Sequence, residues 1–575
     1  MPALHTLPPE IITNIVSQLD RNDCITCIGV CQQWRRAIPP CAANLWADIA
    51  IATNADDTLD HIRYFAPHLR SVTLLSNFGE NRLYDALAKL QECHRIDRLK
   101  MQLASQMKHP EKLIELLRAL SKKTTHRYHR LHTLELHSTR PLPSLLPRII
   151  AACPDVTQLS YAVMPFSVAY RPKLLPVEAR DRLGLTTLRI DTKETSFDLY
   201  AILQHCPSLL RLKVNLMVQL DYHTILQACP FIQVIHSGPF NLLYDYDTHP
   251  SYSQAKDDDD DPCYGVRHLV LHEYRQDRIK NLATLDFILE QHSTLELLHL
   301  ELEGLTCTDW DHLVSRLPHH PFHRLKTLCC RSLYGCRGGH IAALIMACPN
   351  LEHLHLCRMH HLDTPVWRSL LSLRSLEKLE LCIENPDVLV DQQDHHAPPA
   401  AAARRMTTTL NHRHHVVSSS GGILPWFFQT ISRPNTPSLR YLSLSSMGSL
   451  LIDSAVLLAV ASIRTLEELS LEGVEKMLVP PQVMAQFLTR LQQHGTLQHL
   501  ALIRVTRMDI EILDILFGMS HLKTLKITKC KPLTAEILEQ WLEDRKTKNS
   551  DDNTLNRRPL FLHEVKVDNR IIVSR

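Results

Sequence analysis

A six-residue hydrophobic pattern repeats through most of the 575-residue chain and limits the folds that it can adopt. The pattern is LxxLxL, in which Ile, Val or Met can replace a leucine, and most copies start roughly 23 to 35 residues apart. Clear copies start at Leu131, Leu185, Leu209, Val266, Leu295, Leu351, Leu376, Leu439, Leu466, Leu497, Leu522 and Leu562, and weaker ones at Leu69, Ile96, Val156, Ile232 and Leu325. Because side chains alternate between the faces of a strand, the last two leucines of each copy share one face.

Segments with helical spacing of apolar residues, such as 197–205 and 340–347, separate these copies. One strand and one helix cannot enclose their own apolar face, so neighbouring units must stack into a continuous core. Over roughly residues 60 to 570 the chain resembles leucine-rich-repeat solenoids, and specifically their irregular, cysteine-containing subclass. The resemblance implies an α/β fold with a parallel sheet on the concave face.

The stretch "CPNLEHLHLCRMHH" (348–361) is dense in cysteine and histidine, yet it is first of all a junction between a helix and a strand. The same Cys-Pro pair occurs at Cys153, Cys206, Cys229 and Cys348. Proline disfavours helical geometry in the residue before it, so each pair closes a helix, and the cysteine fits as a small apolar plug. Gly495 is expected to end a helix in the same place of its repeat.

Two insertions interrupt the array. Residues 254–265 carry five consecutive aspartates and predict a solvated loop. Residues 385–436 are rich in Ala, Pro, Ser and His and predict a largely disordered insertion, whose "HRHH" motif could hold a metal only weakly.

The first fifty residues lack the repeat. Pro8 and Pro9 suit the first turn of a helix whose apolar residues are Ile11, Ile15 and Leu19. Asp20, Asn22 and Asp23 then predict a break and a new helix N-cap. A single second helix is expected to follow, and its apolar residues are Ile25, Ile28, Val30 and Trp34.

This segment resembles an F-box. The resemblance rests on "LPPEI" at residues 7–11, on Leu19 and Asp23, on "VCQQWR" at residues 30–35 and on "LW" at residues 45–46. It implies a small helical module that docks on the Skp-type adaptor of a cullin-RING ubiquitin ligase. The chain then divides into an F-box (1–50) and a solenoid (51–575).

The resemblance also implies which residues contact the adaptor, namely Leu7, Pro8, Ile11, Ile15, Val30 and Trp34. Some of these side chains must instead belong to the segment's own core. The alternative is a generic helical cap that covers the first repeat.

The composition and the motifs limit the classes of partner and the kinds of chemistry that we expect of this chain. The formal net charge is +2, from 63 Lys and Arg against 61 Asp and Glu, which offers no case for nucleic acid or a membrane surface. The N-terminus lacks the features of a signal peptide, so we expect a cytoplasmic or nuclear protein whose 17 cysteines are thiols. No phosphate-binding loop, dinucleotide-binding or HExxH motif occurs, and Cys24 and Cys27 form a lone CxxC, so we expect no enzyme, no cofactor and no metal.

Polar residues between and after the last two leucines should face the concave surface and bind a substrate. Those from consecutive repeats are His299, Glu301, Cys329, Arg331, His355, Cys357, Glu380 and Cys382. Because adjacent strands lie about 4.8 Å apart, His299, Cys329 and His355 should form a row. Besides a binding surface, this row could be a metal site, or merely a set of tolerated exposed residues.

The two resemblances together predict the substrate-recognition subunit of an SCF-type ubiquitin ligase, which contacts cullin through its adaptor and binds an unidentified protein through its repeats. The alternative is a leucine-rich-repeat scaffold or inhibitor that works outside ubiquitin transfer.

Overall fold

The chain forms two compact units, Met1–Val270 and Leu271–Arg575. The computed structural model describes residues 8–51, 62–75, 79–103, 107–121, 131–139, 145–163, 183–192, 199–216, 220–238, 265–273, 278–302, 304–333, 335–358, 362–383, 423–433, 436–446, 452–473, 479–505, 510–530, 533–551, 564–568 and 570–574. Leu7, nearly all of the acidic loop and most of the 385–436 insertion lie outside these residues. Within the described residues, no helix is long and apolar enough to cross a membrane.

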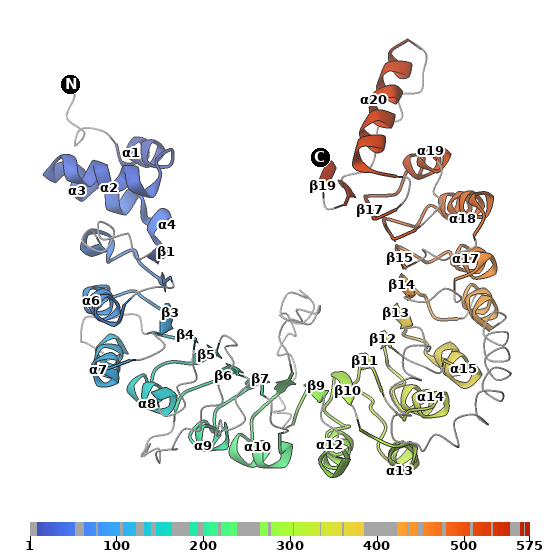
Figure 1. Cartoon of the computed structure of the whole chain (residues 1–575), viewed down its shortest axis with the longest axis horizontal. Helices are drawn as coiled ribbons and strands as arrows, with labels where there is room; N and C mark the ends of the chain where they lie inside the picture. The colour runs from blue at the N-terminus through green and yellow to red at the C-terminus, as the bar shows by residue number, and fades with distance from the viewer. Residues whose placement is uncertain are drawn as a thin grey trace, which may run out of the picture. The chain divides into compact units, whose positions relative to one another are not determined.

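The first unit starts with four short helices and continues as strand-helix repeats (Figure 1). The four helices are α1 (Pro9–Val16), α2 (Arg21–Val30), α3 (Gln32–Cys41) and α4 (Ala43–Trp46). The strands are β1 (Asp48–Ile51), β2 (Ser71–Leu74), β3 (Arg98–Leu103), β4 (Thr133–Ser138), β5 (Gln158–Val163), β6 (Thr187–Asp191), β7 (Arg211–Asn215) and β8 (Val234–Ser237). The repeat helices are α6 (Glu80–Leu90), α7 (Pro110–Ser121), α8 (Leu145–Ala152), α9 (Leu199–Leu203) and α10 (Tyr222–Ala228).

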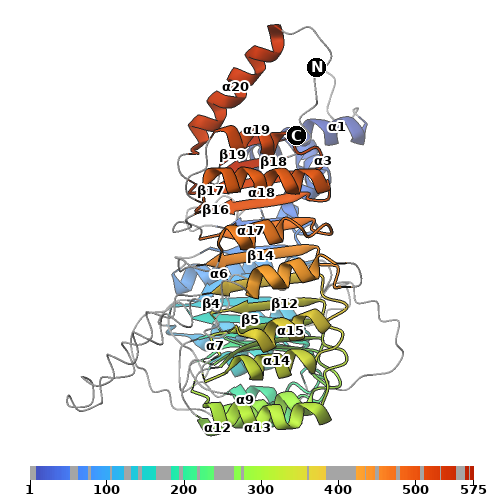
Figure 2. The same ribbon diagram turned by 90° about the vertical axis from the view of Figure 1, so that its right-hand side faces the viewer.

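The second unit continues the same alternation, and Figure 2 shows its helices stacked one above the next. Its strands are β10 (Leu297–Leu302), β11 (Thr327–Arg331), β12 (His353–Cys357), β13 (Lys378–Ile383), β14 (Tyr441–Ser446), β15 (Glu468–Glu472), β16 (His499–Ile503), β17 (Thr524–Thr528), β18 (Glu564–Val567) and β19 (Arg570–Ser574), and β9 (His268–Glu273) contains the boundary between the units. Its helices are α12 (Arg278–Glu290), α13 (Cys307–Arg316), η2 (Leu317–His319), α14 (Gly338–Met346), α15 (Thr364–Ser372), α17 (Ser454–Val460), α18 (Pro481–His494), α19 (Glu511–Phe517) and α20 (Ala535–Asp551).

Each predicted LxxLxL copy forms a strand, and in each unit the helices lie on one face of the sheet (Figure 1). We call the opposite face of the sheet the open face. The pairing is parallel in both units, except that β19 runs antiparallel to β18. The parallel solenoid sheet is therefore confirmed, and the sequence pattern missed only its edge strand β19 and its first strand β1.

The leucines of successive copies align in continuous rows that form the core. In the second unit one row runs through the strands β10 to β18 and consists of Leu298, Leu328, Leu354, Leu379, Leu442, Leu469, Leu500, Leu525 and Val565. All nine side chains are buried. The pair Leu379–Leu442 spans the long insertion, so the insertion leaves the register of the sheet unchanged.

The predicted disorder of 385–436 is wrong for the last part of that insertion. Residues 423–431 are helical, and Phe427 and Phe428 are completely buried. The ring of Phe427 lies 5.1 Å from that of Trp367 on α15. The local sequence "ILPWFFQTI" is apolar enough to join the core, although the residues before it are not.

The Cys-Pro junctions behave as the sequence predicts. Cys153, Cys206, Cys229 and Cys348 are all buried, and the thiols of the last three donate to backbone carbonyls at 3.1 to 3.3 Å. Burial raises the pKa of Cys153, Cys206 and Cys229 to about 12. All cysteines in the described part of the chain are free thiols, and these four therefore serve as packing residues.

The N-terminal helices show one expected and two unexpected features. Asp20 caps α2 in a reciprocal capping box with Asp23, as predicted. The prediction of a single second helix is wrong, because Cys31 has extended backbone geometry and separates α2 from α3. The expected boundary after residue 50 cuts through β1, which pairs in parallel with β2.

Gly495 ends α18 in the left-handed conformation with φ of +66°, as the sequence predicts. A Cβ atom at this position would lie 3.1 Å from the His521 ring. We predict that Gly495→Ala lowers the free energy of unfolding by about 1 kcal/mol, because alanine resists positive φ. Urea unfolding measures the effect.

Gly339→Ala is the matched control. Gly339 lies in α14, and a Cβ atom added there would have no atom within 4 Å outside its own stretch of helix. Alanine favours helix, so this change should be neutral or slightly stabilising. Equal losses for the two variants would contradict the role given to Gly495.

Candidate functional site

The four N-terminal helices enclose a small core of their own. Ile12 and Val16 of α1 are buried, as are Ile28 of α2 and Ile38 of α3. Trp46 is completely buried and stacks on Phe65 with ring centroids 3.6 Å apart. This stacking joins the helical segment to the start of the solenoid.

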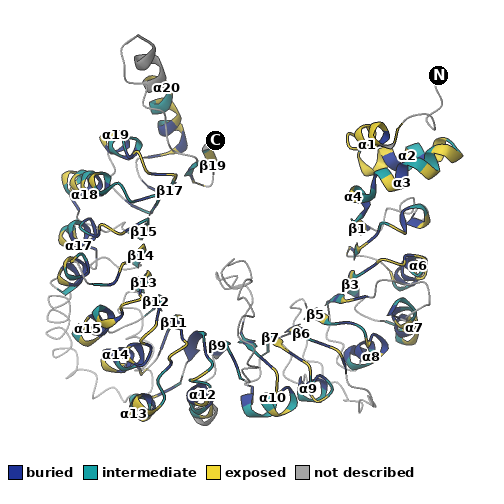
Figure 3. Cartoon of the chain, turned by 180° about the vertical axis from the view of Figure 1, so that it is seen from behind, coloured by how far each residue is buried: buried dark blue, intermediate teal, exposed yellow. Residues whose placement is uncertain are grey.

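Several apolar side chains of the same segment are exposed, and Figure 3 colours much of α1 as exposed. Ile11 and Ile15 are each 45% exposed, and Val30 is 65% exposed. Ile11 and Ile15 are four residues apart on α1 and therefore share one side of the helix. The buried pair of α1 is thus Ile12 and Val16, one residue later than the apolar stripe that the sequence predicted.

The six predicted adaptor contacts fall into three groups. Pro8, Ile11, Ile15 and Val30 are exposed, whereas Trp34 is half-buried. Leu7 lies outside the described residues. The exposed apolar side chains are not among the buried core residues of the segment, and their assignment to adaptor binding stays a prediction.

The predicted row of polar residues on the sheet is present. In the parallel register His299 pairs with Cys329, Cys329 with His355, and His355 with Glu380. The Cys329 Sγ lies 3.9 Å from His299 Nε2 and 3.5 Å from His355 Nδ1. The spacing of the repeats therefore brings these four side chains together, although they are about 80 residues apart in sequence at the extremes.

The row is less exposed than the sequence predicted. His299 and Glu301 are each only 2% exposed, Cys329 and Cys357 are also buried, and all six residues of β10 are buried. Arg331, His355, Glu380 and Cys382 are partly buried. The expectation of freely exposed side chains is wrong here because neighbouring side chains on the open face fill the space between one another.

Charged contacts connect these side chains. His355 Nδ1 lies 3.5 Å from Glu380 Oε2, and Lys378 Nζ lies 2.9 Å from Glu380 Oε1. Arg331 Nε lies 3.6 Å from Glu301 Oε1. The cluster is thus a network of compensated charges and not a patch of one sign.

Cys357 and Cys382 lie opposite each other on β12 and β13. Hydrogen bonding to Cys382 and burial raise the pKa of Cys357. A thiol with a raised pKa is a poor nucleophile at neutral pH. Cys357 therefore contributes packing and not reactivity.

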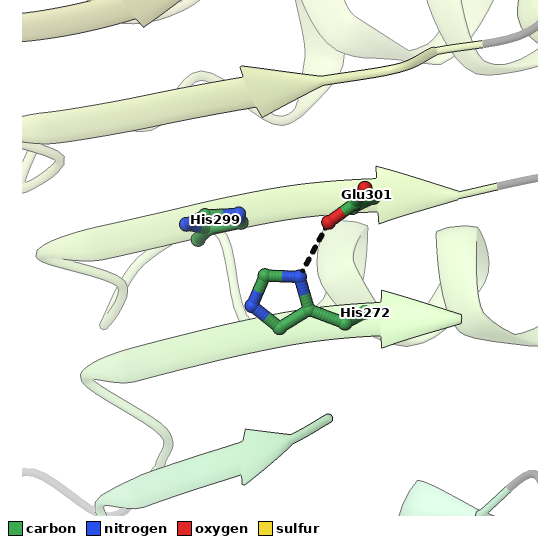
Figure 4. A group of neighbouring side chains, drawn as sticks. All are labelled: His272, His299 and Glu301. Carbon is green, nitrogen blue, oxygen red and sulfur yellow. Dashed lines mark hydrogen bonds and ion pairs between the residues drawn. The ribbon is translucent and has the colours of Figure 1, made fainter. Parts of the chain in front are cut away.

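His272 belongs to the same cluster, and the sequence analysis missed it. Its Nδ1 lies 2.7 Å from Glu301 Oε2, and its ring lies 4.4 Å from that of His299 (Figure 4). His272 directly follows the last leucine of the copy that starts at Val266, which is the position that Glu301 occupies in the next copy. The signal was therefore present in the repeat pattern.

A shallow hollow of about 480 Å³ lies elsewhere in the second unit, just before the strands β14 to β17. Arg440, Glu467, Gln498 and Lys523 are among its lining residues. Arg440 forms a two-point ion pair with Glu467, and Lys523 donates to Gln498 at 2.7 Å. Arg440 and Lys523 are therefore engaged within the protein.

Residues 4–52 match the F-box-like family model. The match covers the four helices and the first strand, including the exposed apolar residues of α1. Together with the strand-helix repeats that follow, it defines the class of this protein: an F-box-like segment joined to a leucine-rich-repeat solenoid.

Three solved structures are similar to the chain, all at low sequence identity. They are the TLR13–ssRNA13 complex (13% identity, 90% of this chain, 72% of that chain, TM-score 0.38), a leucine-rich-repeat protein of Leptospira interrogans (14%, 87%, 96%, 0.36) and an internalin of Listeria monocytogenes (14%, 66%, 98%, 0.30). No curated protein matches the sequence. The assignment of the class therefore rests on the repeats and on the F-box-like match.

The burial of His355 leads to a prediction about how stability depends on pH. Burial lowers its pKa from 6.5, with contributions from Lys378 and Arg331, while Glu380 opposes the shift. The unfolded chain therefore binds a proton at this histidine at a higher pH than the folded chain does. The stability that uncharged His355 contributes is therefore fully present above about pH 6.5. It decreases as the pH falls below that value.

We predict that His355→Gln reduces the loss of unfolding free energy on acidification. The reduction is at most about 1.4 kcal/mol per pH unit, which is the limit for one proton. Urea unfolding at several pH values between neutral and mildly acidic measures it. The exposed His323 provides the control variant His323→Gln, which should follow the wild-type pH profile. The same profile for both variants would contradict the prediction.

Proposed function

We propose that this chain is the substrate-recognition subunit of an SCF-type ubiquitin ligase. The observation that carries the proposal is the apolar surface formed by Ile11 and Ile15 on a segment that matches the F-box-like family. Two isoleucines on one side of a short helix are unfavourable in water and suit a protein partner. The F-box resemblance supports a Skp-type adaptor as that partner, and the adaptor would bring the chain to cullin.

The solenoid supplies the other half of the proposed function. Its open face is a sheet of parallel strands, a surface that repeat proteins use for binding other proteins. In this proposal the repeats bind a target protein, and the ubiquitin-transfer chemistry belongs to other subunits. The chain then works in the cytoplasm or the nucleus.

The buried stacking of Trp46 on Phe65 decides how the proposal is best tested. Deletion of the helical segment would expose Phe65 and could damage the first repeats. Substitutions on the exposed side of α1 avoid this problem, because Ile11 and Ile15 lie outside the core.

We predict that the double variant Ile11→Asp, Ile15→Asp loses adaptor binding by at least about 30-fold, the effect of removing a binding hot spot of 2 kcal/mol. Affinity capture of the full chain from cells, with immunoblots for adaptor and cullin, measures the loss. Proteins bound by the repeats should be retained and should accumulate in the cell.

The control is Thr13→Asp, Ser17→Asp, which adds the same two charges at exposed positions on the opposite side of α1 and at its end. It should bind the adaptor like the wild type. The proposal fails if the wild-type chain recovers neither adaptor nor cullin under conditions in which a known F-box protein recovers both. A leucine-rich-repeat scaffold outside ubiquitin transfer would give that result.

A further inference from the structure

Three buried side chains of the second unit place metal-ligating atoms close together. His272 is at the end of β9, and His299 and Glu301 are on β10 (Figure 4). One nitrogen from each histidine and one carboxylate oxygen all lie within 4.8 Å of one another. The three residues are 6%, 2% and 2% exposed.

The ligand types fit one kind of ion best. Two imidazoles and one carboxylate are a donor set that Zn²⁺ uses in proteins, with bonds of about 2.0 to 2.2 Å. We propose that His272, His299 and Glu301 form a Zn²⁺-binding site on the open face. The proposal is independent of adaptor binding, because these residues lie far along the chain from the F-box-like segment.

The cluster must adjust its ligand distances to hold the ion, because its ligand atoms are gathered only to within 4.8 Å of one another. In tetrahedral coordination two ligand atoms are separated by about 3.3 Å, as their bond lengths require. The contact of 2.7 Å between His272 Nδ1 and Glu301 Oε2 would therefore open slightly. For Zn²⁺ to bind, the proton between these atoms must leave them, by transfer to His272 Nε2 or to solvent, so that Nδ1 offers a lone pair and Glu301 binds as a carboxylate.

Arg331 supports the carboxylate from outside the ligand set. Its Nε lies 3.6 Å from Glu301 Oε1, whereas His272 contacts Oε2. One oxygen of the carboxylate thus faces the ion and the other faces the guanidinium. Such second contacts orient a ligand and are part of most protein metal sites.

A second group of ligand types in the described residues does not suit a metal. Cys307, Asp311 and His340 also lie within 4.8 Å of one another. However, the backbone N–H of Arg337 donates to His340 Nδ1 at 3.0 Å, so the ring proton is on Nε2 and donates to Asp311 at 2.8 Å. In that tautomer neither ring nitrogen has a lone pair directed at the other two residues. This group caps α14 instead.

A bound Zn²⁺ would add a metal contact to the paired ionisable side chains that strand β10 buries on the face that carries no helix. Buried charged groups are costly unless they are paired or coordinate a metal. The ion would link the end of β9 to β10 and would stabilise both in the folded chain. Binding to the folded state alone raises the unfolding temperature.

The test uses the full chain after removal of metals with a chelator. We expect the wild type to bind one equivalent of Zn²⁺ in competition with a chromophoric chelator, and Zn²⁺ to raise its unfolding temperature. Glu301→Gln and His272→Asn should weaken binding by at least about 10- to 100-fold, the range for residues that support metal sites. The controls His340→Gln and His355→Gln should bind like the wild type.

Cobalt provides a second measurement that needs no variant. Co²⁺ in place of Zn²⁺ should give visible absorption bands without the thiolate charge-transfer band that cysteine ligands produce. Three outcomes would overturn the proposal: a folded wild type that binds no stoichiometric ion, wild-type affinity in both Glu301→Gln and His272→Asn, or a strong thiolate band. The second would place the ion on other residues, and the third would show that cysteine is among its ligands.

Discussion

Each repeat presents leucines that only its neighbours can bury, and the rest of the structure depends on this requirement. A strand of five or six residues and one helix are too small to enclose a core, so stability comes from stacking. The row from Leu298 to Val565 shows how strict the stacking is, because each pair of strands keeps the same register. Burial of one such leucine contributes about 1.5 to 3 kcal/mol, which explains why the long insertion leaves the sheet intact.

The same requirement explains the junctions between helices and strands. Each helix must end at a fixed place so that the next strand starts in register, and at five junctions the chain achieves this with a Cys-Pro pair or with Gly495. The buried thiols of Cys206, Cys229 and Cys348 fill the turn and donate to nearby carbonyls. The high density of cysteine and histidine at 348–361 is therefore mainly a consequence of solenoid geometry.

Two surfaces depart from what folding alone requires. The F-box-like segment leaves Ile11 and Ile15 in water although it buries Ile12 and Val16 beside them. On the open face, β10 buries the ionisable residues His299 and Glu301, whereas a strand such as β15 leaves the equivalent positions partly exposed. The first departure suits a protein partner and the second suits an ion, so the two functions proposed for this chain depend on different residues and different forces.

The sequence by itself determined the strands β2 to β18, because a leucine at every second position can be buried only in an extended segment. It also determined the Cys-Pro helix ends and the row His299–Cys329–His355, since the register follows from the repeat. The tertiary structure decided which side of α1 is buried, and it joined β1 and β19 to the sheet, although neither carries the pattern. It also decided the burial of Glu301 and its contact with His272. Alternation assigns a side chain to a face of the sheet, but only the packing of neighbouring side chains sets its exposure and its contacts.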